Sequence, residues 1–217
     1  VNGLTEQGIE VHDLGIVPID TVYFAVGKYE YDGGAMITAS HNPKEYAGIK
    51  LVGKGMKWIR GREILELIDQ NPEIQPASQK GEIIKKNLIP DHIAHLLSFA
   101  DASKIKPLKI VVDAGNGMAG KMIPELFKNL PQLNLVPLFF ELDGSFPNHP
   151  SNPLEPESQV EISKKVVAEK ADLGAIFDGD SDRMFLFDET GRFVRADLTL
   201  LILARRLLQK YAGAGIA

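Results

Sequence analysis

The sequence has 217 residues, enough for one large domain or two small ones, and hydrophobic residues make up 44% of it. The net charge of −5, with no run of lysines and arginines, argues against a nucleic-acid-binding protein. The chain has no cysteine, which excludes disulfides and thiolate metal sites. Its longest hydrophobic run, residues 198–208, is interrupted by Arg205 and Arg206 and predicts no membrane span. We therefore expect a cytoplasmic protein.

Strand and helix patterns alternate along the chain, which is typical of an α/β fold. The first part predicts strands over residues 9–14, 35–38 and 48–52 and helices over residues 18–28, 61–69 and 90–103. Two prolines in the polar residues 70–81 predict a loop, and residues 104–107 resemble a domain linker. The chain starts at Val1 as if within a helix and stops in a loop-to-strand pattern. We interpret it as a piece of a longer protein.

The second part starts a new unit with the same alternation. Its strands are expected over residues 108–112, 133–140, 173–177, 184–188 and 193–194, and its helices over residues 119–130, 157–169 and 197–210, with Asp197 as the last N-cap. In both parts a strand leads into a polar loop and a second strand leads out, which indicates a duplicated domain. We expect one domain at residues 1–104, a second at 105–195, and the start of a third at 196–217.

An acidic loop follows the strand at residues 173–177. Asp178, Asp180 and Asp182 alternate along it, so their side chains point the same way in an extended backbone. Converging carboxylates repel one another, and oxygen ligands of this kind suit Mg²⁺ or Mn²⁺. A solvated acidic turn is the plain alternative. A calcium-binding EF-hand loop is another, with Glu189 at its last ligand position, but Arg183 replaces its turn glycine.

Two roles are open for Arg183. Beside three carboxylates it either forms a plain salt bridge or reaches a second anion such as phosphate.

A serine stands at the tip of the loop Thr38-Ala39-Ser40-His41-Asn42-Pro43. Pro43 restricts its own backbone and that of Asn42, which predicts a rigid loop. A serine hydroxyl can act as a nucleophile or carry a phosphate. The surrounding residues do not form a G-x-S-x-G turn, so a hydrolase triad is not indicated. The neighbouring His41 is weak support for a catalytic dyad.

These motifs together resemble the α-D-phosphohexomutases, in their phosphomannomutase/phosphoglucomutase branch. The resemblance rests on the serine loop with Tyr46, Gly48 and Lys50, on the acidic loop, and on residues 113–117 and 143–149. It covers nearly the whole chain. It departs from the family pattern at Ser181 and Ala47, neither of which is a predicted ligand.

The resemblance implies mixed-sheet, three-layer α/β domains, tandemly duplicated. Residues 1–104 would be domain I without its N-terminal part, residues 105–195 domain II, and residues 196–217 the start of domain III. The remainder of domain III and domain IV would be the partners of this chain, which by itself is expected to be inactive.

The resemblance also implies a reaction and its residues. Phosphoryl would move between the 6- and 1-positions of a mannose or glucose phosphate through a hexose 1,6-bisphosphate. Ser40 would carry the phosphate, and Mg²⁺ would bind Ser40 and the three aspartates. Lys50 would act as acid/base or hold phosphate, while His41, Asn42 and Arg183 would support the loop or bind phosphate. Phosphoglucosamine mutase and a non-catalytic metal- or sugar-phosphate-binding module are the alternatives.

Overall fold

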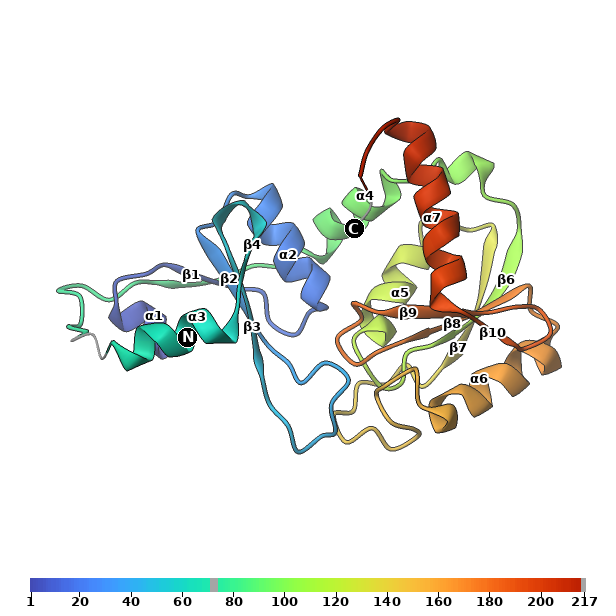
Figure 1. Cartoon of the computed structure of the whole chain (residues 1–217), viewed down its shortest axis with the longest axis horizontal. Helices are drawn as coiled ribbons and strands as arrows, with labels where there is room; N and C mark the ends of the chain where they lie inside the picture. The colour runs from blue at the N-terminus through green and yellow to red at the C-terminus, as the bar shows by residue number, and fades with distance from the viewer. Residues whose placement is uncertain (71–73, 216–217) are drawn as a thin grey trace. The chain divides into compact units, whose positions relative to one another are not determined.

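The computed structural model describes residues 1–70 and 74–215, which form two compact units (Figure 1). The first unit comprises Val1–Thr38 and Ala47–Ala100, and the second comprises Ala39–Tyr46 and the residues from Asp101 onward. The serine loop therefore packs with the second unit, although the strands on either side of it belong to the first. The expected boundary at residue 104 stays a prediction. Among the described residues, no helix is long and hydrophobic enough to span a bilayer.

The first unit contains two small sheets. β2 (Gly33–Ile37), β3 (Ile49–Gly53) and β4 (Lys57–Ile59) form an antiparallel sheet, and β1 (Val11–Asp13) pairs in parallel with β5 (Ile83–Lys85). The sequence patterns predicted β1, β2 and β3 but not the short β4 and β5. The helices of this unit are α1 (Asn2–Glu6), α2 (Ile19–Lys28), α3 (Gly61–Asp69) and α4 (Ile89–Leu97).

Helix α2 packs on the β2–β3 sheet. A side chain at Gly34 would lie 2.8 Å from Val22 and 2.8 Å from Val26, so the missing side chain lets helix and sheet approach closely. Val52 on β3 is buried on the same side, as are Ile19 and Val26 of the helix. This small core holds β2, from which the serine loop leaves, and β3, to which it returns.

The second unit is built on a five-stranded sheet in the order β10-β9-β8-β6-β7. Its strands are β6 (Leu108–Asp113), β7 (Leu133–Leu138), β8 (Leu173–Phe177), β9 (Met184–Phe187) and β10 (Phe193–Val194). β6, β7 and β8 are parallel, whereas β9 and β10 are antiparallel to their neighbours. The expected mixed α/β fold is confirmed.

Helices α5 (Ala119–Phe127) and α6 (Pro156–Glu169) lie on opposite faces of this sheet (Figure 1). The chain runs from β6 outward to β7 and then back past β6 to β8, so two right-handed crossovers must place their helices on opposite sides. Ile162 and Val166 of α6 pack on Val111 and Ile176 in a fully buried cluster. The order of the strands reverses between β6 and β8, which is where open α/β sheets bind ligands beyond their strand ends.

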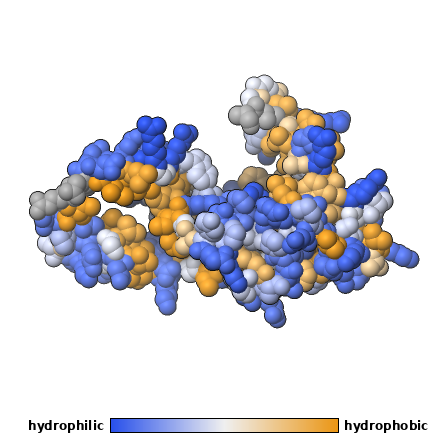
Figure 2. All heavy atoms as spheres, turned by 60° about the horizontal axis from the view of Figure 1, so that its bottom comes forward, coloured by the Kyte–Doolittle hydropathy of each residue, from blue (hydrophilic) through white to orange (hydrophobic). Residues whose placement is uncertain are grey.

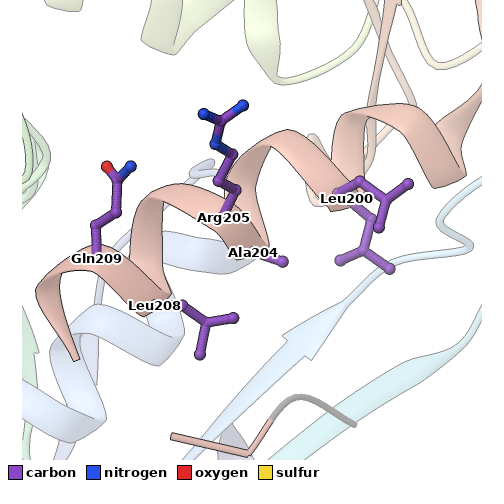
Figure 3. A pocket seen from close by; sticks show the side chains of 6 residues that line it. Leu200, Ala204, Arg205, Leu208 and Gln209 are labelled. Carbon is purple, nitrogen blue, oxygen red and sulfur yellow. The ribbon is translucent and has the colours of Figure 1, made fainter. Parts of the chain in front are cut away.

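The last helix, α7 (Ala196–Lys210), has no buried residue and exposes a row of leucines. Figure 2 shows hydrophobic surface gathered over it, and Figure 3 shows Leu200, Ala204 and Leu208 along one side with Arg205 and Gln209 on another. Leu201 is 64% exposed and Ile202 is 66% exposed, so α7 presents an exposed hydrophobic patch.

Two details of the predicted helices were wrong. Arg195, not Asp197, is the N-cap of α7, and Asp197 lies in the first turn, where it pairs with Arg195 at 2.7 Å. The helix expected over residues 90–103 ends at Leu97, followed by a separate short 3₁₀ turn at Ala102–Lys104. Part of the loop expected over residues 70–81 lies outside the described residues.

Candidate active site

The acidic loop leaves the sheet at the end of β8 and re-enters it as β9. Asp178 and Asp180 are buried and Asp182 is exposed, and one oxygen of each lies within 4.8 Å of the others. The set consists only of carboxylate oxygens, which are the ligands of hard divalent cations such as Mg²⁺. The residues present therefore fit the metal that the sequence predicts.

The same geometry rules against the calcium-binding alternative. An EF-hand loop joins two helices, but this loop is flanked by the strands β8 and β9. Glu189, the proposed last ligand, lies in the exposed turn between β9 and β10, and it does not belong to the carboxylate cluster of the described residues.

Arg183 brings a positive charge next to the aspartates. Its Nε and Nη2 lie 2.8 Å and 2.6 Å from Oδ2 of Asp178, and its Nε lies 3.5 Å from Oδ1 of Asp182. Burial raises the pKa of Asp178, the charge of Asp180 raises it further, and the backbone N–H and charge of Arg183 oppose the rise. The carboxylates thus repel one another, and Arg183 compensates only part of their charge.

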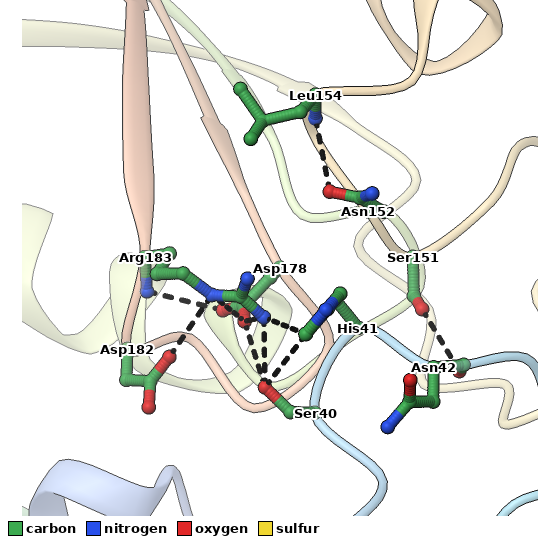
Figure 4. Close-up of polar contacts among 9 residues, drawn as sticks. All are labelled: Ser40, His41, Asn42, Ser151, Asn152, Leu154, Asp178, Asp182 and Arg183. Carbon is green, nitrogen blue, oxygen red and sulfur yellow. Dashed lines mark hydrogen bonds and ion pairs between the residues drawn. The ribbon is translucent and has the colours of Figure 1, made fainter. Parts of the chain in front are cut away.

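Ser40 meets this cluster directly (Figure 4). Its Oγ donates to Oδ2 of Asp178 at 3.2 Å and accepts from Nη2 of Arg183 at 2.9 Å. Its backbone is left-handed, with φ of 54°, a conformation that costs free energy for a residue with a side chain. Strained residues of this kind concentrate at functional sites.

The loop residues after Ser40 have distinct contacts. Nη2 of Arg183 contacts Nδ1 of His41. A guanidinium only donates hydrogen bonds, so Nδ1 is the acceptor in this contact. The backbone oxygen of Asn42 accepts from Oγ of Ser151 at 3.4 Å, while its side chain is exposed (Figure 4).

Lys50 lies on β3 in the first unit, opposite Met36 of β2. The structure therefore brings Ser40, His41 and Arg183 together with the aspartates, and it places Lys50 on the strand to which the serine loop returns.

Sequence reasoning missed Gly179, which lies between the two loops. A Cβ at this position would come within 2.6 Å of the Ser40 carbonyl oxygen and 3.4 Å of the Phe146 ring. Only glycine allows the loops to approach this closely. The alternation Asp-x-Asp-x-Asp drew attention to the aspartates, and nothing in the local pattern distinguished the glycine between the first two.

Asp113 and Asn116 organise the turn after β6. Oδ1 of Asp113 accepts from the backbone N–H of Gly115 at 2.8 Å. The side chain of Asn116, itself left-handed at φ of 60°, donates to the backbone oxygen of Glu141 at 2.9 Å.

Comparison with known proteins agrees with this geometry. Residues 1–74 match the model of the phosphoglucomutase/phosphomannomutase alpha/beta/alpha domain I, and residues 90–191 match that of domain II. A phosphomannomutase of Vibrio cholerae is 43% identical over 99% of this chain and 48% of its own length. A phosphomannomutase/phosphoglucomutase of Pseudomonas aeruginosa is 36% identical over 100% of this chain and 46% of its own.

Among solved structures, a phosphoglucomutase/phosphomannomutase family protein of Burkholderia thailandensis has a TM-score of 0.86 and 32% identity. The match covers 98% of this chain and 47% of that protein. The chain thus spans about half the length of the relatives it matches. With two domain models of one family matched in their natural order, the chain belongs to the phosphoglucomutase/phosphomannomutase family.

Proposed function

We propose that this chain is the phosphate-carrying part of a phosphohexomutase, an isomerase that moves phosphoryl between the 6- and 1-positions of a hexose phosphate. The supporting observation is the convergence on Ser40. Its Oγ contacts both Asp178, at 3.2 Å, and Arg183, at 2.9 Å, although the loops that carry these residues are far apart in the sequence. Because the chain spans about half of its relatives, the activity would belong to the complete protein.

In this proposal Ser40 carries the phosphoryl group between turnovers. A phosphoserine has a charge of about −1.5 to −2 near neutral pH. Arg183 is already at hydrogen-bond distance from Oγ and would contact the phosphate oxygens. Asp178, Asp180 and Asp182 would hold Mg²⁺, which when bound would neutralise phosphate charge and orient the group for transfer.

Transfer moves one phosphorus atom between two oxygens. The bond from Oγ of Ser40 to phosphorus breaks as a bond from the sugar hydroxyl oxygen forms, and the hydroxyl proton leaves to a base. The product is a hexose 1,6-bisphosphate, which returns its other phosphate to Ser40. Lys50 is our candidate for the proton transfer or for holding the phosphate, with Asn42 and His41 as further phosphate contacts.

The substrate is a hexose phosphate, with mannose and glucose phosphate as the candidates that the names of the relatives suggest. Phosphoglucosamine is the alternative substrate, and a non-catalytic module that only binds metal or sugar phosphate is the alternative function. The rest of the protein would supply the sugar-recognising residues and cover the exposed leucines of α7. It is the partner we propose for this chain.

Mass spectrometry of Ser40 tests the proposal. The complete protein is incubated with glucose 1,6-bisphosphate and Mg²⁺, alongside Ser40→Ala and, as a control outside the site, Ser103→Ala, whose Oγ bonds to Asp101 at 2.6 Å on the surface. We expect phosphate on Ser40 in the wild type and in Ser103→Ala, and none in Ser40→Ala. An unmodified Ser40 in folded protein that still binds Mg²⁺ would instead support the binding module.

A further inference from the structure

A buried pair of ionisable residues, Asp113 and His149, lies at the same sheet edge as the acidic loop. Asp113 ends β6 and is fully buried, and His149 is 9% exposed. Nε2 of His149 lies 3.1 Å from Oδ1 of Asp113. In the sheet Asp113 pairs with Ile176, two residues before Asp178. The pair therefore lies next to the site, and neither residue is one of the predicted metal ligands.

The hydrogen bonds fix the charge of this pair. Nδ1 of His149 lies 2.8 Å from the backbone oxygen of Pro150, which only accepts, so Nδ1 carries a proton. A second proton must lie between Nε2 and Oδ1 of Asp113, because that oxygen otherwise offers only lone pairs. Whichever atom holds it, the pair has no net charge. Burial alone would lower the pKa of His149, but the bond to Asp113, its charge and the Pro150 carbonyl together raise it.

Asp113 is connected to the acidic loop through the turn that it organises. Oδ1 of Asp113 accepts from the N–H of Gly115, and the turn continues to Met118, whose N–H donates to the backbone oxygen of Gly179 at 2.9 Å. A Cβ at Gly117 would lie 2.7 Å from that same oxygen. The turn and the acidic loop are therefore in backbone contact at the residue that touches Ser40.

His149 is connected to both loops through its own segment, residues 143–152, which we call the clamp. Within the clamp, the ring of Phe146 faces Gly179 at 3.4 Å from an added Cβ. Oγ of Ser151 donates to the backbone of Asn42 in the serine loop at 3.4 Å. Asn148 donates to Asn116 at 2.8 Å and fastens the clamp to the turn after β6. One segment thus contacts the serine loop, the acidic loop and the turn.

We propose that the Asp113–His149 pair is a neutral anchor that holds the clamp and thereby positions Ser40 against the acidic loop. The proposal rests on the proposed phosphoryl transfer. Neither residue touches the reacting atoms, so both are positioning residues. Neutrality matters because an unpaired Asp113 would add a buried negative charge close to three carboxylates and a phosphoserine.

His149→Gln tests the anchor in the complete protein. The glutamine amide can still donate to Asp113 but cannot supply the second proton of the pair, so the pair is no longer neutral by itself. Misplacing a reacting group by about 1 Å can cost about 100-fold in rate. We expect kcat per folded molecule to fall about tenfold to 100-fold with KM nearly unchanged. Asp113→Asn combined with His149→Gln restores a neutral pair and should recover most of kcat.

His92→Gln is the matched control, because His92 is also a buried histidine, 4% exposed, and bonds to Thr21 in the first unit. It should lower the melting temperature without lowering kcat. Should His149→Gln fold poorly, Phe146→Ala tests the clamp at a half-buried position, and we expect kcat to fall again with KM unchanged.

The outcomes separate this inference from the proposed function. If the wild type carries phosphate on Ser40 but His149→Gln or Phe146→Ala keeps kcat within about twofold, the positioning role is refuted and the mutase proposal stands. Loss of kcat in His149→Gln without recovery in the double variant refutes the neutral anchor. A wild type that never carries phosphate on Ser40 refutes the proposed function itself.

Discussion

Replacing Arg183 with glutamine should destabilise the second unit in a way that depends on pH and on Mg²⁺. Nε and Nη2 of Arg183 lie 2.8 Å and 2.6 Å from Asp178, which is fully buried, and Asp180 is 2% exposed. Removing one partner of a buried ion pair typically costs about 3–5 kcal/mol, because the other charge stays buried. Arg183 is one-third exposed, so we take the lower end, about 3 kcal/mol.

The carboxyl group of Asp178 sets an independent upper limit on this destabilisation. Asp178 can escape its unpaired charge by taking up a proton, and from an unfolded pKa of about 3.9 this costs at most about 4 kcal/mol at pH 7. The same step costs only about 1.5 kcal/mol at pH 5. The destabilisation caused by Arg183→Gln should therefore shrink as the pH falls. The direction follows because burial and the charge of Asp180 already raise the pKa of Asp178.

Thermal melts of the complete protein check both numbers. Without Mg²⁺ at pH 7, Arg183→Gln should lower Tm by about 10 °C, and the deficit should fall by more than half at pH 5. Mg²⁺ should raise Tm more in the variant than in the wild type, since a bound cation replaces the missing charge. Arg192→Gln is the control, because Arg192 pairs with Asp188 at 3.1 Å on the surface and is 79% exposed.

A melting temperature for Arg183→Gln within about 2 °C of the wild type at pH 7 would refute the reasoning. An equal deficit at both pH values would show that the buried carboxylates are not its source.

Three further predictions concern stability. Burial lowers the pKa of His92 to about 4, so the unfolded state takes up protons first as the pH falls. Between pH ~6.5 and pH 5, His92 should lower the free energy of unfolding by about 2 kcal/mol. Denaturant titrations should show this loss in the wild type and not in His92→Gln. Ser181 has φ of 69°, so Ser181→Gly should raise the free energy of unfolding by about 0.5–1 kcal/mol, and a loss would show that its hydroxyl is needed. Lys170 ends α6 at φ of 49°, so Lys170→Gly should gain a similar amount, whereas Lys164→Gly within the helix should lose about 1 kcal/mol.

The sequence predicted most elements because their patterns are local. β8 and β10 have the expected bounds, as has α3, and β6 differs by one residue. β4 and β5 were missed because strands of three residues give no periodicity of their own. The two-residue β10 was found from the turn that joins it to β9. Asp197 was mistaken for an N-cap because an aspartate in the first turn and one at the cap give the same local signal.

The residues of the site could also be predicted from the sequence, but the contacts between them could not. Ser40 and Asp178 are 138 residues apart, and no local pattern encodes a contact over that separation. The contact depends on Gly179 and on the clamp, whose Asp113–His149 pair joins residues 36 positions apart. The family resemblance supplied what periodicity could not, because it treats the separate motifs as one site.

The charges of the site indicate why phosphate on the serine loop and a cation on the acidic loop would favour each other. The three carboxylates and the guanidinium of Arg183 together have a net charge of about −2. Phosphate on Ser40 would bring this to about −4, which a divalent cation would reduce by half. Binding free energies are reciprocal, so if phosphorylation tightens Mg²⁺ binding, Mg²⁺ must stabilise the phosphorylated state equally. Calorimetry with and without phosphate on Ser40 should therefore give a tighter Kd for the phosphorylated protein, and an unchanged Kd would mean that metal and phosphate do not share a site.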